Sequence, residues 1–259
     1  MDRRAPIIAL TAALAVAGCT GETTPLVTVE APRDGGCAVD ETPRTYQVYF
    51  VIDVSGSMVR FLEDLASQLQ AFAASFPETD SQDTPVFVEY YVVAFVNDVR
   101  WFPDGLSRRM TSPIAVQGAF EQAIEAGADE QNLTRQVRNA ETEENLLDAL
   151  QSVVDADPAA DVIQVIIATD APFAEAPTVL STNLPVSSTY PQVAAGLERI
   201  GAEVHVFTKE QLDGLTRNYN GMPPLTSEGS TINDLDDLAE SRDLILSALA
   251  NIADRSNCN

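Results

Sequence analysis

Apolar residues occur in this sequence in short unbroken runs. Between these runs are stretches in which polar residues separate the apolar ones. The unbroken runs are rich in Val, Ile, Tyr and Phe, which is typical of strands buried on both faces of a parallel sheet. The predicted strands are Gln47 to Val54, Val86 to Val96 with Val99 to Phe102 pairing back across Asn97-Asp98, Asp161 to Thr169, and Glu203 to Phe207.

Between these runs, apolar residues recur every three or four positions, as they do in amphipathic helices. The predicted helices are Ser57 to Phe76, which Pro77 ends, Ile114 to Ala126, Glu143 to Val154, Pro191 to Ile200, Lys209 to Arg217, and one within Ile232 to Ala253. Strands that alternate with helices predict a doubly wound α/β fold, with a mostly parallel central sheet flanked by helices.

The first residues have the pattern of an export signal. Arg3 and Arg4 precede an apolar run from Ala5 to Ala17, which is shorter than the roughly 20 residues of a membrane-spanning helix. The small residues before Cys19 resemble a bacterial lipobox, which implies that residues 1–18 are a signal peptide and that Cys19 becomes the lipidated N-terminus. An ordinary signal peptide with a chance cysteine is the alternative. Thr20 gives a weak preference for the outer membrane or the cell surface.

Residues 19–45 are rich in Thr, Pro, Gly and acidic residues, and we interpret them as a polar tether before one domain at residues 46–259. Two cysteines, Cys37 and Cys258, remain at opposite ends of the exported chain. An even pair in an oxidising compartment usually forms a disulfide, although two free thiols are the alternative.

The formal net charge of −24 argues against nucleic acid and anionic lipid surfaces as partners, so contact with the membrane is expected only through the lipid anchor. His205 is the only histidine, and it lies in a predicted buried strand, where we expect a hydrogen-bonded core residue. Catalysis by a Ser-His or Cys-His pair therefore lacks its components, and the chain is not expected to be an enzyme.

Oxygen-bearing side chains follow two of the predicted strands. Asp53, Ser55 and Ser57 come at the end of the first strand, and Asp170 directly follows Asp161 to Thr169. In doubly wound sheets, ligands bind beyond the carboxyl ends of the strands. Carboxylates and hydroxyls suit hard cations, and Mg²⁺ in particular accepts a few protein oxygens and keeps waters on its other positions. The alternative is that the serines cap the following helix.

The stretch Asp53-Val54-Ser55-Gly56-Ser57 resembles the Asp-x-Ser-x-Ser motif of von Willebrand factor type A domains, and Thr169-Asp170-Ala171 is similar to the Thr-Asp-Gly of that family. The resemblance covers about residues 45 to 255. It implies a metal-ion-dependent adhesion site, in which Mg²⁺ or Mn²⁺ is held and one coordination position is left for a carboxylate of a protein partner.

Glu144 lies where integrin β I-like domains complete this site with a glutamate, so the resemblance implies a metal set of Asp53, Ser55, Ser57, Glu144 and Asp170. Integrin β I-like domains also have a second site, which binds calcium next to the first. The corresponding residues here are Asn97, Asn139, Glu141 and Glu143. Glu143 replaces a proline of the family and Asn97 an aspartate. Integrin β domains have a third metal site, which needs paired acids directly after the serines. This chain has Val59-Arg60 there, so the third site is not expected.

The resemblance therefore implies a surface-anchored lipoprotein of the bacterial envelope that binds an Asp- or Glu-bearing protein or peptide in a metal-dependent way. Two other functions stay open: a metal-dependent hydrolase, and a metal-free structural scaffold of the envelope. The acids near Glu144 also have a simpler interpretation, because acidic residues are favoured in the first turn of a helix.

Overall fold

The computed structural model describes residues 43–76, 78–79, 84–103, 108–128, 143–180, 184–209 and 231–235. The chain divides into two compact units, Met1–Ala38 and Val39–Asn259, and the first of them lies outside the described residues. None of the described helices is long and apolar enough to cross a membrane.

The second unit is built on a six-stranded sheet with the strand order β3-β2-β1-β4-β7-β8. Neighbouring strands pair in parallel, except that β3 runs antiparallel to β2. The strands are β1 (Arg44–Asp53), β2 (Val86–Phe95), β3 (Val99–Phe102), β4 (Val162–Ala168), β7 (Ala202–Thr208) and β8 (Thr231–Asp234), and a separate ribbon pairs β5 (Val179–Leu180) with β6 (Leu184–Pro185). The predicted fold class, a doubly wound and mostly parallel α/β sheet, is confirmed.

Strand β1 suits the middle of the sheet because its residues from Tyr46 to Ile52 are all apolar or aromatic apart from Gln47. Every side chain from Tyr46 to Asp53 is buried. β1 pairs with β2 along its whole length and with β4 from Tyr46 to Ile52. The chain continues from β1 to β2 on one side and later returns to β4 on the other, so the carboxyl ends of β1 and β4 flank the point at which the strand order reverses.

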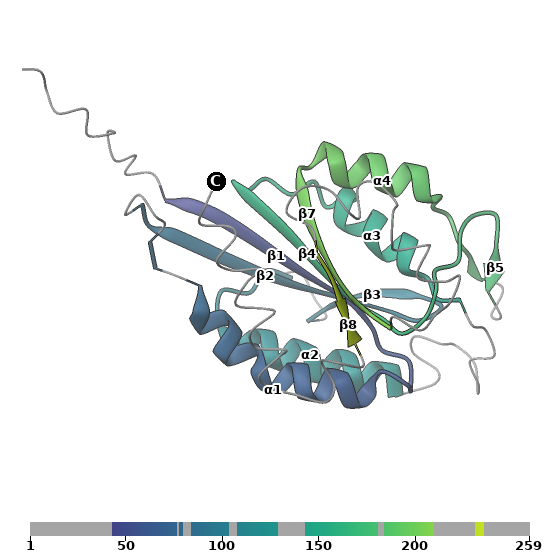
Figure 1. The fold of residues 1–259 in the computed structure, drawn as a ribbon, viewed down its shortest axis with the longest axis horizontal. Helices are drawn as coiled ribbons and strands as arrows, with labels where there is room; N and C mark the ends of the chain where they lie inside the picture. Colours follow the sequence, from purple (N-terminus) through teal and green to yellow (C-terminus); the bar gives the residue numbers. More distant parts are fainter. Residues whose placement is uncertain are drawn as a thin grey trace, which may run out of the picture. The chain divides into compact units, whose positions relative to one another are not determined.

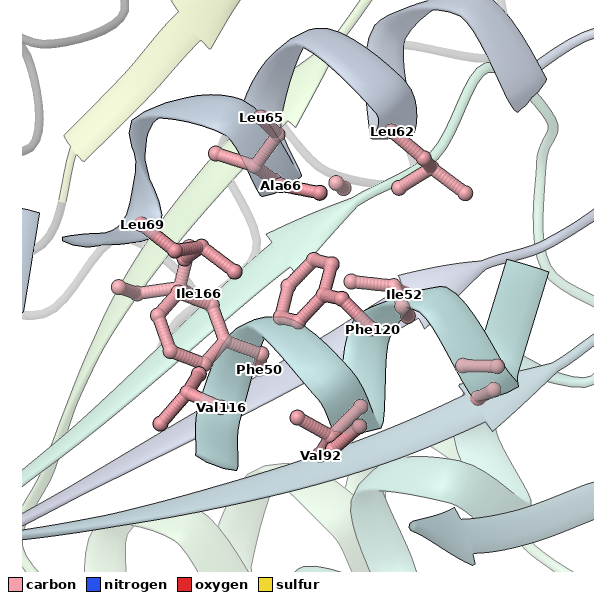
Figure 2. Packing of buried hydrophobic residues seen from close by; sticks show 14 of the residues in the cluster. Phe50, Ile52, Leu62, Leu65, Ala66, Leu69, Val92, Val116, Phe120 and Ile166 are labelled. Carbon is pink, nitrogen blue, oxygen red and sulfur yellow. The ribbon is translucent and has the colours of Figure 1, made fainter. Parts of the chain in front are cut away.

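Among the described helices, two lie on each face of the sheet (Figure 1). Helices α1 (Val59–Ser75) and α2 (Pro113–Ala128) lie on one face, and α3 (Leu146–Asp155) and α4 (Tyr190–Arg199) lie on the other. Figure 2 shows how the first layer packs, with Leu62 and Leu69 of α1 and Phe120 of α2 directed at the side chains of β1. The rings of Phe50 and Phe120 meet edge to face with centroids 5.1 Å apart.

The predicted strands and the first four predicted helices are found within a few residues of their expected ends. β1 already includes Arg44 and Thr45, which the sequence pattern assigns to the tether. The strands β5, β6 and β8 are not predicted by the apolar pattern, because β5 and β6 have two residues each and β8 is a short strand at the edge of the sheet. The predicted helix after Lys209 and most of the predicted last helix lie outside the described residues.

Helix α2 contains one glycine that is packed tightly against the residue after β1 and one that is not. Substituting each of them tests how closely α2 approaches the end of β1. A Cβ on Gly127 would collide with the backbone oxygen and the side chain of Val54, directly after Asp53, whereas a Cβ on Gly118 would meet nothing within 4 Å. We expect Gly127→Ala to lower the free energy of unfolding by about 1 to 3 kcal/mol, the usual cost of overpacking.

Gly118→Ala removes a glycine from the same helix without a collision, so it should raise the stability by about 0.5 to 1 kcal/mol. Urea unfolding of both variants and the wild type measures the difference. Equal stabilities of the two variants would contradict the close approach of α2 to the end of β1.

Candidate metal site

The side chains of the candidate site come from the carboxyl ends of β1 and β4. Asp53 is the last residue of β1 and is completely buried, and Asp170 lies two residues after the end of β4. Ser55 and Ser57 belong to the turn between β1 and α1. The parallel pairing of β1 with β4 places both strand ends at one edge of the sheet.

Hydrogen bonds join these four residues into one cluster. The hydroxyl of Ser57 donates to Oδ1 of Asp170 at 3.0 Å, and the hydroxyls of Ser55 and Ser57 lie 3.2 Å apart. The backbone N–H of Ser55 donates to Oδ1 of Asp53 at 2.8 Å. Thr169 adds a donor, because its hydroxyl bonds to Oδ2 of Asp53 at 2.9 Å.

The serines do not cap the helix that follows them. Helix α1 begins after Met58, and no side chain makes a capping hydrogen bond at its N-terminus. The hydroxyl of Ser57 bonds to Asp170, a residue that follows a different strand. The helix-cap interpretation of Asp53, Ser55 and Ser57 is therefore wrong for the arrangement observed.

The pKa of Asp53 is raised to about 6, chiefly because the side chain is buried and also because the negative charge of Asp170 is nearby. Hydrogen bonds from Ser55 and Thr169 act in the opposite direction, because they stabilise the ionised carboxylate. The ammonium of Lys209 lies 3.2 Å from Oδ2 of Asp170 and brings a positive charge to the same cluster. The cluster thus contains two acidic side chains that are largely buried, and the ammonium of Lys209 lies beside one of them.

Glu144 is buried, and its backbone bonds to the loop that follows Asp170. Its N–H donates to the carbonyl of Pro172, and its own carbonyl accepts from the N–H of Ala174, both at 2.8 Å. The next residue, Asn145, bonds through its N–H to the carbonyl of Val96 and through its side chain to the carbonyl of Asn97. Residues 144 and 145 therefore connect the loop after β4 with the end of β2.

The donor set fits a hard cation that keeps several waters. Asp53 and Asp170 provide carboxylates, and Ser55 and Ser57 provide hydroxyls, which is the oxygen chemistry that Mg²⁺ or Mn²⁺ accepts. Within the described residues, no three His, Cys, Asp or Glu side chains gather as a metal site would need. The structure therefore brings together two acids and two serines, and it does not add Glu144 to them as a third acid.

Of the residues predicted for a second site, the structure describes two. Asn97 is fully buried at the turn after β2, whereas Glu143 is exposed. Asn139 and Glu141 lie outside the described residues, so the second site stays a prediction. The same holds for the lipidation of Cys19 and for the disulfide between Cys37 and Cys258, because all three cysteines lie outside the described part of the chain.

Two residues of the cluster were not among the predicted site residues. Thr169 precedes Asp170, and the motif already contains it, but its bond to Asp53 depends on how β1 and β4 pair. Lys209 is the only lysine of the sequence and follows β7. The signal that could have identified Lys209 is the register of β4 and β7, which apolar patterning alone does not fix.

No protein-family model matches the sequence, and no curated protein matches it. Among solved structures, the chain is similar to human COPII-coat protein Sec24c, with a TM-score of 0.53 and 17% identity over 85% of this chain and 33% of that chain. Proximal thread matrix protein 1 of the mussel byssus gives a TM-score of 0.49 and 14% identity, over 80% of this chain and 46% of that chain. A von Willebrand factor type A structure from Catenulispora acidiphila gives 0.45 and 14%, over 83% of this chain and 43% of that chain.

The chain thus spans a third to just under a half of the length of these structures. At such low identity, the similarity to Sec24c shows a shared fold and nothing about ligands. The observed strand order and layers are those of the doubly wound, mostly parallel α/β fold that the sequence predicts.

The raised pKa of Asp53 gives a prediction about stability. The folded protein holds the proton of this carboxyl up to about pH 6, whereas the usual value is 3.8. The stabilisation linked to the protonated form is therefore complete below about pH 3.8 and is lost as the pH rises through 6. We expect Asp53→Asn, measured in EDTA at pH 7.5, to raise the free energy of unfolding by about 1 to 3 kcal/mol.

The asparagine side chain keeps an oxygen for the N–H of Ser55 and removes the buried charge, and the gain should shrink when urea unfolding is repeated at pH 5. Asp161→Asn is the matched control, because Asp161 is exposed and also accepts a backbone N–H, that of Thr45. An Asp53→Asn variant less stable than the wild type at both pH values would show that burial of Asp53 costs nothing.

Proposed function

We propose that this chain is a protein-binding domain that works through a divalent cation held at the carboxyl ends of β1 and β4. The observation that carries the proposal is the hydrogen bond from Ser57 to Asp170, which joins residues 113 positions apart and brings two acids and two hydroxyls to one point. Ser57 bonds to this acid and the hydroxyl of Ser55 contacts that of Ser57, so neither serine caps α1 and both side chains lie within the cluster.

The residues of the cluster would have different roles in binding the ion. Asp170, Ser55 and Ser57 provide oxygens beyond the ends of β1 and β4, and Asp53 provides a negative charge beside them, where the N–H of Ser55 and the hydroxyl of Thr169 orient it. A bound Mg²⁺ or Mn²⁺ supplies an electrophilic position for a carboxylate ligand. Asp or Glu of a protein or peptide partner fits that position.

Glu144 belongs to the proposed site as an acid that binds the cation directly or through water. Its backbone bonds fix it between the loops that follow β2 and β4, so a change in the loop after β4 reaches Glu144 through two hydrogen bonds. A Ca²⁺ ion at Asn97, Asn139, Glu141 and Glu143 is the corresponding proposal for the adjacent site.

Binding is a better account of the cluster than hydrolysis. His205, the only histidine of the sequence, is fully buried in β7 and lies 3.0 Å from the hydroxyl of Thr231 through Nδ1, so its ring does not face solvent as a general base would. The strongly negative charge also favours a protein partner over a nucleic acid.

The first residues of the sequence support a proposal for the location of the protein in the cell. A lipid on Cys19 would hold the domain at the bacterial envelope through the tether of residues 19–45, at the outer membrane or the cell surface. A disulfide between Cys37 and Cys258 would tie the two ends of the exported chain together.

Thermal unfolding of the full chain, purified in detergent, tests the metal site. At 100 times its dissociation constant, a ligand adds about 2.7 kcal/mol, which corresponds to a rise of about 5 to 10 °C for a chain of this size. We expect this rise with Mg²⁺ or Mn²⁺ relative to EDTA in the wild type. Asp53→Asn and Ser57→Ala should lose it, and the distant Asp161→Asn should keep it.

A peptide with a single glutamate should then bind to the metal-loaded protein and not in EDTA, which fluorescence anisotropy can measure. Metal-independent binding of partners, together with no metal-induced rise, would favour a structural scaffold with this fold. Phosphoester hydrolysis that needs metal and Asp53 would favour the hydrolase instead.

A further inference from the structure

The register of the sheet brings Lys209 next to Asp170. Strands β4 and β7 pair in parallel with Ala168 beside Phe207, and the N–H of Thr169 bonds to the carbonyl of Phe207 at 3.0 Å. Asp170 and Lys209 lie two positions beyond this pair on their own strands, so both leave the sheet at the same edge. The ammonium of Lys209 reaches Oδ2 of Asp170 at 3.2 Å.

This ammonium lies among the oxygens that the proposed cation would use. The other oxygen of Asp170 accepts the hydroxyl of Ser57, and the two oxygens of Asp53 accept the N–H of Ser55 and the hydroxyl of Thr169. Each of the four carboxylate oxygens therefore has a donor from the chain itself. The side chain of Asp170 is only 8% exposed, so its charge is largely removed from water.

A dication and an ammonium cannot share one carboxylate without repelling each other. The side chain of Lys209 is 36% exposed, and its flexible stem allows the ammonium to turn into solvent while the backbone stays in place. We propose that Lys209 is a built-in competitor of the divalent cation, so that the site exchanges the ammonium for the metal when the metal binds.

The proposal rests on the metal site described above and adds its regulation. Without metal, the ammonium offsets the repulsion between Asp53 and Asp170 and keeps Asp170 in place for Ser57. With metal, the ion pair with Lys209 is broken, and the cost of breaking it raises the metal concentration at which the site is half filled. Lys209 therefore sets the affinity of the site without being a ligand.

Mn²⁺ titration of the full chain in detergent, followed by calorimetry, measures this effect. Lys209→Met keeps an unbranched side chain and removes the charge, and we expect its apparent dissociation constant for Mn²⁺ to be about 3- to 10-fold lower than that of the wild type. Arg199→Met is the matched control. Arg199 pairs with Asp157 at 3.7 Å and lies before the start of β7, so the same charge is lost at the opposite edge of the sheet, and the dissociation constant should stay unchanged.

A second measurement uses the wild type and does not depend on the stability of a variant. Lys209 is the only lysine, so acylation by an amine-reactive ester can be assigned to it by peptide mapping. An ammonium held against Asp170 is shielded from the reagent, and we expect saturating Mn²⁺ to increase the acylation rate severalfold over EDTA. Asp170→Asn should give the high rate in both conditions.

The outcomes separate this inference from the proposed function. Mn²⁺ binding by the wild type with equal or weaker binding by Lys209→Met would overturn the competition and leave the metal site standing. Acylation of Lys209 that saturating Mn²⁺ leaves unchanged would overturn the competition in the same way. If neither protein binds Mn²⁺, the metal site fails and the inference fails with it. Binding by Lys209→Met alone would support the exchange, with the ammonium as the stronger competitor.

Discussion

The pairing of β1 with β2 on one side and β4 on the other is the constraint on which the rest of the structure depends. A strand with neighbours on both edges and helices on both faces must be apolar along its length, and β1 is buried from Tyr46 onward. The carboxyl ends of parallel strands lie on the same side of the sheet. This pairing therefore also brings Asp53, the turn at Asn97 and Asp170 together. The same interaction that forms the core thus assembles the candidate site.

The position of Asp53 carries an energetic cost that the cluster offsets only in part. As the last residue of a buried strand, it has no exposed surface, and its pKa rises to about 6 because burial disfavours the charged form. Hydrogen bonds from the N–H of Ser55 and the hydroxyl of Thr169 stabilise the ionised carboxylate and offset part of this cost. A residue held in an unfavourable environment by the surrounding fold is common at functional sites, where stability is exchanged for chemistry.

Much of the fold and the centre of the site could be predicted from the sequence, because both depend on local patterns. The apolar runs that end at Asp53 and before Asp170 mark buried strands, and the spacing of the serines is visible directly. The pattern could not give β8, a four-residue edge strand, or the two-residue strands β5 and β6. It also could not give the contact between Lys209 and Asp170, because that contact depends on the register between β4 and β7.

The type of residue at position 209 fits an exchangeable cation better than a permanent ion pair. Of the 15 basic residues in the sequence, 14 are arginines, and the one lysine lies beside the acid of the candidate site. An arginine could bind both oxygens of Asp170 with its planar fork, displace the hydroxyl of Ser57 and hold the carboxylate too firmly for a metal to enter. A lysine is a point charge on a flexible stem, so it can neutralise one oxygen, leave the other to Ser57, and withdraw. The chain therefore places its only easily displaced cation where a metal would have to displace it.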